Sequence, residues 1–302
     1  MERRTLGRTG LEVTVIGFGA MTIGGVFGPV DDGESNRALH AAVDAGMNFI
    51  DTSDAYGAGH SETVIGKFLN ERTDRGDILI FTKGGNDMST GARNFTPEYI
   101  GGCLEGSLKR LGMDAIDYYQ LHNPNVDNMA AEDSYALLEQ AKADGKIKHW
   151  GVSINTVEEC YLAAEQDKPA TMQMEYNVIS QEAAPAFARA KEADVGVISR
   201  VPLKRGFLSG RIDEAFEFAE GDRRKGILSP ENIRKFQTQL ARTQEVAGNL
   251  GISPAQAAIR FCVSNENVSC VIPGIRTPEQ SVQNAACGES LPAEAVKRLQ
   301  EV

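Results

Sequence analysis

The chain has 302 residues, of which 42 are acidic and 31 basic, giving a formal net charge of −11. This excess of negative charge disfavours binding to a nucleic-acid backbone or to an anionic membrane surface. Hydrophobic residues make up 41% and charged residues 24%, a composition typical of a globular protein with a large core, which excludes an intrinsically disordered chain. The length alone fits either two domains or one α/β barrel.

The cysteines and the N-terminal residues indicate a reducing compartment. The five cysteines are scattered and form no C-x-x-C pair, which argues against a disulfide framework and against a zinc ribbon. The first residues are charged and lead into a glycine-containing turn without an apolar segment of the kind found in secretory signals. We therefore expect a cytoplasmic protein.

Short apolar segments alternate along the chain with segments of helical length. A turn over residues 5–10 predicts an N-terminal hairpin. The predicted strands are 13–18, 47–50, 78–82, 116–121, 149–152, 171–174, 195–199 and 268–272. The predicted helices are 34–45, 61–71, 97–111, 130–144, 157–166 and 181–193, with a helical pattern resuming at 233 and a short C-terminal helix over 292–300.

This alternation predicts parallel strands joined by right-handed crossovers. Eight such strands fit a closed (β/α)₈ barrel at least as well as an open sheet, and no repeat or linker divides the chain. We expect an α/β fold in which residues 1–302 form a single TIM-barrel domain. The long connection over 202–232 is either a lid or binding loop or a solvated surface insertion.

Polar residues follow the apolar part of several predicted strands. Asp51, Lys83 and His122 each come directly after one, and in a barrel these positions lie at the carboxyl face, where barrel enzymes place their active sites. Each residue alone also has a structural explanation: Asp51 as a cap, Lys83 as a solvated charge and His122 as a satisfied histidine. Their convergence, with Tyr56 on the loop after Asp51, favours a catalytic site.

The chemistry of these four side chains suits proton donation to a carbonyl group. Tyrosine ordinarily has a pKa of about 10, so an acid working near neutral pH needs a perturbed phenol. We expect Lys83 to depress the pKa of Tyr56, and Asp51 to keep the buried ammonium charged. His122 is placed to donate a hydrogen bond to a carbonyl oxygen that gains negative charge. A separate hydride source would complete a reduction.

Four segments carry a resemblance to a known family. They are Asn-Phe-Ile-Asp-Thr-Ser-Asp-Ala-Tyr-Gly at 48–57, Thr-Lys-Gly at 82–84, Tyr-Tyr-Gln-Leu-His at 118–122 and Ile-Pro-Gly at 272–274. In order and spacing the sequence resembles the aldo-keto reductase family over essentially its whole length. The resemblance implies a (β/α)₈ barrel and an NADPH-dependent carbonyl reductase, with Tyr56 as general acid, Lys83 and Asp51 tuning it, and His122 orienting the carbonyl.

A separate phosphate signal lies near the C-terminus. The Gly-Phe-Gly at 17–19 lacks the third glycine of a Rossmann fingerprint, because position 22 is threonine. Thr277 and Gln280 instead form a T-x-x-Q capping box with Pro278 at the first helical position, which predicts a helix whose N-terminus attracts anions. Arg276 would suit the 2′-phosphate of NADP, or else it is a solvated arginine beside a plain cap.

The resemblance also implies cofactor contacts along the strand ends. Ser153 and Gln173 would hold the nicotinamide carboxamide, 202–206 the pyrophosphate, and Gln280 and Asn284 the adenine region. The full expected set is Met21, Asp51, Ser153, Gln173, Arg200, Pro202, Leu203, Lys204, Arg205, Gly206, Gly274, Arg276, Thr277, Gln280 and Asn284.

Two positions depart from the family pattern. Ile154, not asparagine, follows Ser153, and Asn155 comes one place later. Arg200 takes the place of the tyrosine that often stacks on the nicotinamide. We expect Arg200 either to recognise an anionic or hydroxylated substrate or to bias the site toward the reduced cofactor.

The leading hypothesis is reduction of an aldehyde or ketone, keto-sugars included, with NADP as cofactor and a small molecule as the partner. A second is an NADPH-binding regulatory or redox-sensing subunit without turnover. A metal-dependent hydrolase is disfavoured, because the four histidines follow no ligand spacing. The same hydride chemistry also allows oxidation of an alcohol.

Overall fold

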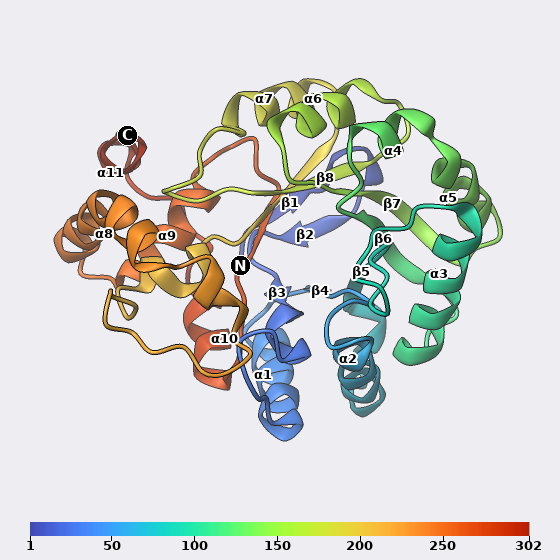
Figure 1. Cartoon of the computed structure of the whole chain (residues 1–302), viewed down its shortest axis with the longest axis horizontal. Helices are drawn as coiled ribbons and strands as arrows, with labels where there is room; N and C mark the ends of the chain where they lie inside the picture. Colours follow the sequence, from blue (N-terminus) through green and yellow to red (C-terminus); the bar gives the residue numbers. More distant parts are fainter. Residues whose placement is uncertain (302) are drawn as a thin grey trace.

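The computed structural model describes residues 1–301, and within them eight parallel strands form a nearly closed barrel surrounded by helices (Figure 1). The barrel strands are β3 (Phe18–Gly19), β4 (Phe49–Asp51), β5 (Leu79–Gly84), β6 (Ile116–His122), β7 (Ile147–Ser153), β8 (Thr171–Glu175), β9 (Gly196–Arg200) and β10 (Cys270–Ile272). Each pairs in parallel with the next along the chain, and bridges from Ile16 to Val271 and from Gly19 to Gly274 bring β10 back to β3. The predicted TIM barrel is confirmed.

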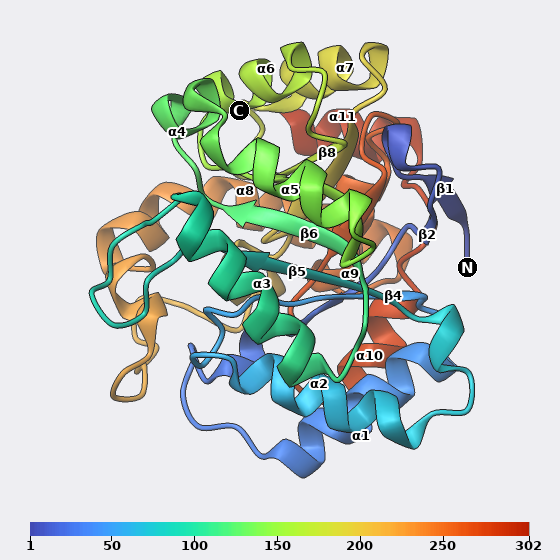
Figure 2. The ribbon, with the colours of Figure 1, turned by 90° about the vertical axis from the view of Figure 1, so that its right-hand side faces the viewer.

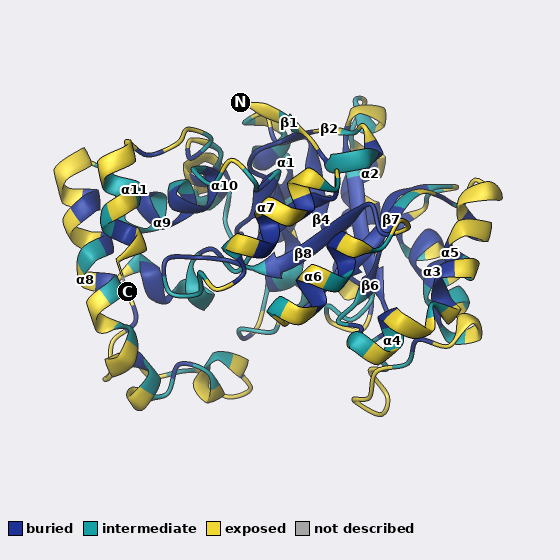
Figure 3. Cartoon of the chain, turned by 90° about the horizontal axis from the view of Figure 1, so that it is seen from above, coloured by how far each residue is buried: buried dark blue, intermediate teal, exposed yellow. Residues whose placement is uncertain are grey.

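The helices pack around the strands with their apolar sides inward (Figures 2 and 3). They are α1 (Asp32–Asp44), α2 (His60–Glu71), α3 (Pro97–Leu111), α4 (Val126–Ala131), α5 (Asp133–Ala143), α6 (Val157–Glu165), α7 (Ala184–Glu192), α8 (Pro230–Leu250), α9 (Pro254–Val263), α10 (Pro278–Ala285) and α11 (Ala293–Gln300). Helix α1 is representative, since Asp31 caps its first turn and Ala38, Leu39 and Ala42 are buried. Across residues 1–301, none of the helices combines the length and the apolar character that crossing a membrane requires.

The interior of the barrel is filled in layers because side chains on a strand alternate between its two faces. Phe49, Phe81 and Tyr118 point inward and form an apolar floor with ring centroids 5.0 Å apart in each neighbouring pair. The hairpin of β1 (Arg3–Thr5) and β2 (Glu12–Thr14) adds Leu6 and Val13 to this cluster. The next inward position on β4, β5 and β6 lies two residues further on, toward the carboxyl ends of the strands.

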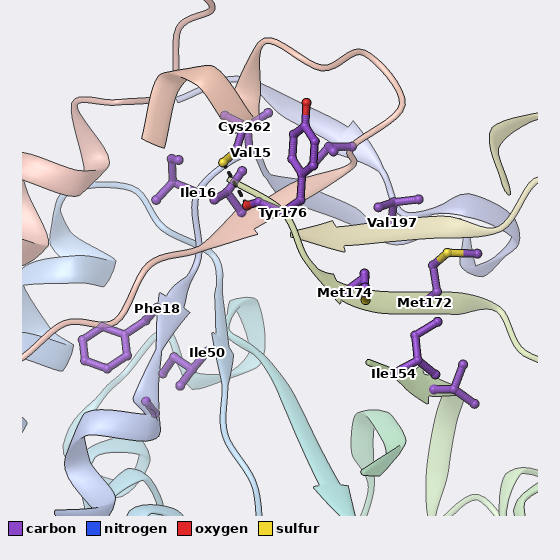
Figure 4. Packing of buried hydrophobic residues seen from close by; sticks show 14 of the residues in the cluster. Val15, Ile16, Phe18, Ile50, Ile154, Met172, Met174, Tyr176, Val197 and Cys262 are labelled. Carbon is purple, nitrogen blue, oxygen red and sulfur yellow. Dashed lines mark hydrogen bonds between the residues drawn. The ribbon is translucent and has the colours of Figure 1, made fainter. Parts of the chain in front are cut away.

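The outward side chains of the strands form a second, larger layer against the helices. Figure 4 shows part of it, with Ile50, Met172 and Val197 among the buried aliphatic side chains. The Cys262 thiol donates a hydrogen bond to the Tyr176 carbonyl oxygen over 3.2 Å in the same region. This layer fixes the helices around the barrel and leaves its carboxyl face to the loops.

The structure corrects two predicted elements. Residues 13–18 are not one strand. Thr14 ends β2 and donates its backbone N–H to Asn48 Oδ1 over 2.8 Å, and the barrel strand begins only at Phe18. The predicted helix 130–144 is interrupted at Glu132, whose φ of 54° is left-handed and separates α4 from α5.

Candidate active site

A buried ion pair lies directly above the apolar floor of the barrel. Asp51 ends β4 and Lys83 lies on β5, and the Lys83 ammonium donates to Asp51 Oδ1 over 2.5 Å and to the Thr52 carbonyl oxygen over 2.8 Å. The exposed fractions of the two side chains are 0% for Lys83 and 2% for Asp51. Because a buried charge needs a partner, each of these two groups depends on the other.

The second oxygen of Asp51 is held by two amides. Gln173 Nε2 donates to Asp51 Oδ2 over 2.8 Å and Gln120 Nε2 does so over 3.3 Å, while Ser153 Oγ donates to Gln173 Oε1 over 3.4 Å. Ser153 and Gln173 are thus hydrogen-bonded to each other, and the Gln173 amide also donates to Asp51. Sequence reasoning missed Gln120, which lies two residues before His122 on the same face of β6.

Tyr56 reaches the ion pair from the loop after β4. A tight turn, with Tyr56 N–H donating to the Ser53 carbonyl oxygen over 3.1 Å, directs the phenol back over the strand ends. Gly24 lies against this turn so closely that a Cβ there would be 2.6 Å from Gly57 N. The Lys83 ammonium donates to Tyr56 Oη over 3.4 Å. The three groups therefore form one array.

Burial determines the resting protonation of this array. It raises the pKa of Tyr56 above the ordinary 10.0 and outweighs the opposite effect of Lys83, so the expected net depression is wrong for this structure. Burial also lowers the pKa of Lys83, but the charge of the Asp51 carboxylate and the hydrogen bonds to Asp51 and Tyr56 more than offset this effect, and that pKa is raised. At neutral pH the phenol is protonated and the ammonium is charged.

His122, at the end of β6, lies beside Tyr56 with the two ring centroids 5.9 Å apart and the rings nearly perpendicular. Burial, and after it the positive charges of Lys83 and Arg200, hold the pKa of His122 well below its usual 6.5. His122 Nδ1 is 2.9 Å from Ser53 Oγ. A neutral imidazole with one nitrogen bound to a serine is suited to hydrogen bonding rather than to carrying a charge.

Arg200 ends β9, and its guanidinium crosses to the end of β7. Its Nη2 donates to the Ile154 carbonyl oxygen and to Asn155 Oδ1, both over 2.9 Å. Its Nε–H is buried and has no hydrogen-bond partner within residues 1–301. A buried donor without an acceptor is costly, so this atom is a place where a ligand oxygen would be favoured.

The segment after β9 carries the two cations expected along a pyrophosphate, and one of them is paired within the protein. Pro202 and Leu203 lead into a kinked turn in which Arg205 and Gly206 have φ of 58° and 94°. Lys204 is paired with Glu175 over 2.6 Å and also donates to Ser180 Oγ over 2.8 Å, so its charge is already neutralised within the protein. Arg205, the other of these two cations, forms no such ion pair within residues 1–301.

The segment after β10 forms the predicted helix, α10, with a different cap. Thr277 Oγ1 accepts the Gln280 N–H over 3.3 Å, but Gln280 Oε1 accepts from Arg276 N–H over 2.8 Å instead of from Thr277. The expected reciprocal capping box is therefore only half formed. The Arg276 guanidinium donates to the Pro29 carbonyl oxygen over 2.8 Å, so it holds the loop after β3.

The remaining expected cofactor residues flank this region. Met21 lies on a 3₁₀ turn (Ala20–Gly24) and is partly exposed, whereas Asn284 on α10 is buried. Gly274 follows β10, and a Cβ there would meet only the Thr22 side chain, at 3.4 Å. A bridge between Gly19 and Gly274, and the hydrogen bond from Arg276 to Pro29, place the segment after β10 beside the loop after β3.

The chain resembles known proteins along nearly its whole length. The model of the aldo/keto reductase family matches residues 15–302. The chain is 30% identical over 300 residues to the protein named aldo-keto reductase yakc [NADP(+)] of Schizosaccharomyces pombe, covering 96% of this chain and 88% of that protein. It is 28% identical over 313 residues to the uncharacterized oxidoreductase YqkF of Bacillus subtilis, covering 99% and 96%.

Two solved structures are similar along nearly their whole length. The holo form of aldo-keto reductase AKR11C1 from Bacillus halodurans has a TM-score of 0.83 and 26% identity, covering 99% of this chain and 95% of that one. Glycerol dehydrogenase AKR11B4 from Gluconobacter oxydans has a TM-score of 0.84 and 28% identity, covering 98% and 93%. With the family model matching nearly every residue, the chain belongs to the aldo/keto reductase family.

Proposed function

We propose that this protein is an NADPH-dependent oxidoreductase that reduces an aldehyde or ketone to the alcohol, with Tyr56 as the general acid. The observation that carries the proposal is the array of Tyr56, Lys83 and Asp51 beside His122 at the carboxyl face of the barrel. Packing alone does not require a phenol next to a buried ammonium. Proton transfer to a carbonyl oxygen does require an acid at this place and a positive charge that stabilises the phenolate.

Each of the four side chains has a distinct task in this reaction. The Tyr56 phenol, protonated at neutral pH, gives its proton to the carbonyl oxygen as negative charge builds there. The phenolate that results is stabilised by the Lys83 ammonium 3.4 Å away, and Asp51 keeps that ammonium charged. His122, being neutral, orients the carbonyl through a hydrogen bond and does not compete with Tyr56 as an acid.

The protein side of the site fits a nicotinamide dinucleotide phosphate. Ser153, Gln173 and the unpartnered Nε–H of Arg200 lie at the strand ends beside the array, where polar groups would hold the nicotinamide end. Arg205 and the start of α10, with Arg276, offer the positive charge that phosphates need. When bound, NADPH supplies the hydride for the carbonyl carbon. The relative from Schizosaccharomyces pombe carries NADP(+) in its name.

Arg200 is the residue that we expect to bear on substrate or cofactor preference. Its guanidinium is fixed by Ile154 and Asn155, just after β7. Its free Nε–H would donate to a carboxylate or hydroxyl oxygen of a substrate, keto-sugars included, or its charge would favour the reduced over the oxidised nicotinamide. Arg200→Tyr should change the affinity for substrate in the first case and the ratio of the NADPH and NADP affinities in the second. Unchanged affinities for all three would remove both roles.

The proposed activity is tested by following NADPH consumption over a panel of aldehydes, quinones and keto-sugars. Glyceraldehyde and dihydroxyacetone belong in the panel because one structural relative is named a glycerol dehydrogenase. Tyr56→Phe should lower the rate by roughly 10²–10⁴-fold, the usual effect of losing a general acid. Tyr161→Phe, at an exposed tyrosine on α6, is the matched control and should be neutral.

Three results would each contradict a part of the proposal. Turnover that survives Tyr56→Phe would show that another group donates the proton. NADPH binding without turnover of any carbonyl would instead support a regulatory or redox-sensing subunit. Failure to bind NADPH, measured directly by fluorescence, would remove the cofactor assignment.

A further inference from the structure

Ser53 connects His122 to a carboxyl group outside the catalytic array. Ser53 Oγ is 2.9 Å from His122 Nδ1 and 3.2 Å from Asp54 Oδ1. The Ala55 N–H donates to the same oxygen over 3.1 Å, and the Lys83 carbonyl oxygen lies 3.3 Å away. Because a hydroxyl carries one proton, Ser53 can fully satisfy only one of the acceptors around it at a time.

The choice of acceptor determines which nitrogen of His122 carries the proton. If Ser53 donates to His122 Nδ1, the single proton of the neutral imidazole is on Nε2. If Ser53 donates to Asp54, its oxygen accepts from Nδ1–H and Nε2 is left with a lone pair. Since Nδ1 is the His122 nitrogen that contacts Ser53, Nε2 is the nitrogen left for a substrate oxygen.

Asp54 can change its charge near neutral pH. Burial, opposed by a hydrogen bond from Cys103, raises the pKa of Asp54 from 3.8 to about 6, with Glu62 adding to the rise and Arg110 opposing it. An ionised carboxylate accepts a hydrogen bond about twice as strong as a neutral acceptor does, so it competes with His122 for the Ser53 proton. A protonated carboxyl largely loses this advantage.

The surroundings of Asp54 give it access to protons from water. It lines a cleft of about 580 Å³ between the β4 loop, the β5 loop and α3, whose walls do not include Tyr56, Lys83 or His122. The titratable and charged groups facing Asp54 are Cys103, Tyr99 and Arg110 of α3, Glu62 of α2 and Tyr119 of β6. Those facing His122 are Tyr56 of the β4 loop, Lys83 of β5, Arg93 of the loop after β5 and Arg200 of β9.

We propose that Asp54, acting through Ser53, is a positioning residue that sets the tautomer of His122 and thereby whether this imidazole can donate a hydrogen bond to the substrate oxygen. With Asp54 protonated, His122 presents Nε2–H, which donates to the carbonyl oxygen and stabilises the negative charge that builds there. With Asp54 ionised, His122 presents a bare Nε2, which cannot donate to this oxygen, so proton transfer from Tyr56 is slower. The net change is one proton taken up from water by Asp54, since the imidazole exchanges one N–H for the other and stays neutral.

The catalytic consequence rests on the proposed carbonyl reduction, but the tautomer can be measured without any substrate. Long-range ¹H–¹⁵N spectra of the ¹⁵N-labelled full chain distinguish the two tautomers of each of the four histidines. The signal that disappears in His122→Gln assigns His122. We expect its Nε2–H fraction to rise as the pH falls from about 8 to about 5, with a midpoint near 6.

Variants separate the proposed link from a general structural effect. In Asp54→Asn and in Ser53→Ala the tautomer of His122 should no longer respond to pH over this range. Glu98→Gln removes another carboxyl from the same cleft, one on the first turn of α3, and should keep the wild-type response. A His122 tautomer that is constant in the wild type, or that still changes in Asp54→Asn, would overturn the proposal.

Kinetics then tests the consequence for catalysis. The value of kcat/KM for carbonyl reduction should fall between about pH 5 and about pH 8 in the wild type and in Glu98→Gln, and this component should vanish in Asp54→Asn. If no carbonyl is turned over, the proposed function fails while the tautomer measurement still stands. If carbonyls are reduced but kcat/KM has the same pH profile in Asp54→Asn as in the wild type, the catalytic role of Asp54 fails alone.

Discussion

Lys83→Met removes the ammonium that balances Asp51 while keeping a side chain of similar length. The Asp51 carboxylate would then be buried with only the amides of Gln120 and Gln173 as hydrogen-bond donors. Removing one partner of a buried ion pair typically costs about 3–5 kcal/mol of folding free energy. With an unfolding entropy of about 2.1 cal/mol/K per residue, the 302 residues give about 0.6 kcal/mol/K, so Tm should fall by about 5–8 °C.

The assay is differential scanning calorimetry at neutral pH. Asp51→Asn combined with Lys83→Met should recover part of the lost stability, because the uncompensated charge is gone although the catalytic array is still broken. Lys235→Ala, which breaks an exposed pair with Glu231 on α8, is the matched control and should barely move Tm. If Lys83→Met lowered Tm no more than this control, the argument that the ion pair is buried and mutually dependent would be refuted.

Two further predictions concern stability. The folded-state pKa of Asp54 is raised from 3.8 to about 6, so the protonated carboxyl contributes fully to the free energy of unfolding below pH 3.8, and this contribution is lost as the pH rises through 6. Between these limits the free energy of unfolding of Asp54→Asn should therefore rise by up to about 3 kcal/mol relative to that of the wild type. Parallel curves of Tm against pH for the two proteins would contradict this. Gly151→Ala would place a methyl group against the Tyr118 hydroxyl and the Thr171 carbonyl oxygen and should cost about 1–3 kcal/mol in denaturant unfolding. Gly102→Ala, on an open face of α3, should instead stabilise, and equal effects of the two substitutions would count against the packing argument.

The order of the elements and the place of the main polar side chains followed from the sequence. Alternating strand and helix patterns predicted the parallel barrel, since each apolar segment needs a crossover before the next can pair with it. Asp51, Lys83 and His122 were identifiable because each follows a buried strand, and parallel strands bring their carboxyl ends to one face. The exact match of α3 to residues 97–111 reflects Pro97 at its start and Gly112 at its end.

The sequence did not determine the partners of these groups, which depend on distances between distant segments and on burial. Lys204 pairs with Glu175, Gln280 accepts from Arg276, and Ser53 bonds to His122, although each side chain had other candidates nearby in the sequence. The same holds for protonation, because the tertiary structure decides how much burial opposes the charge of Lys83 at Tyr56. Local patterns thus specify which groups arrive at the carboxyl face, and packing specifies what each one does there, since hydrogen bonding and desolvation act only between groups already brought together.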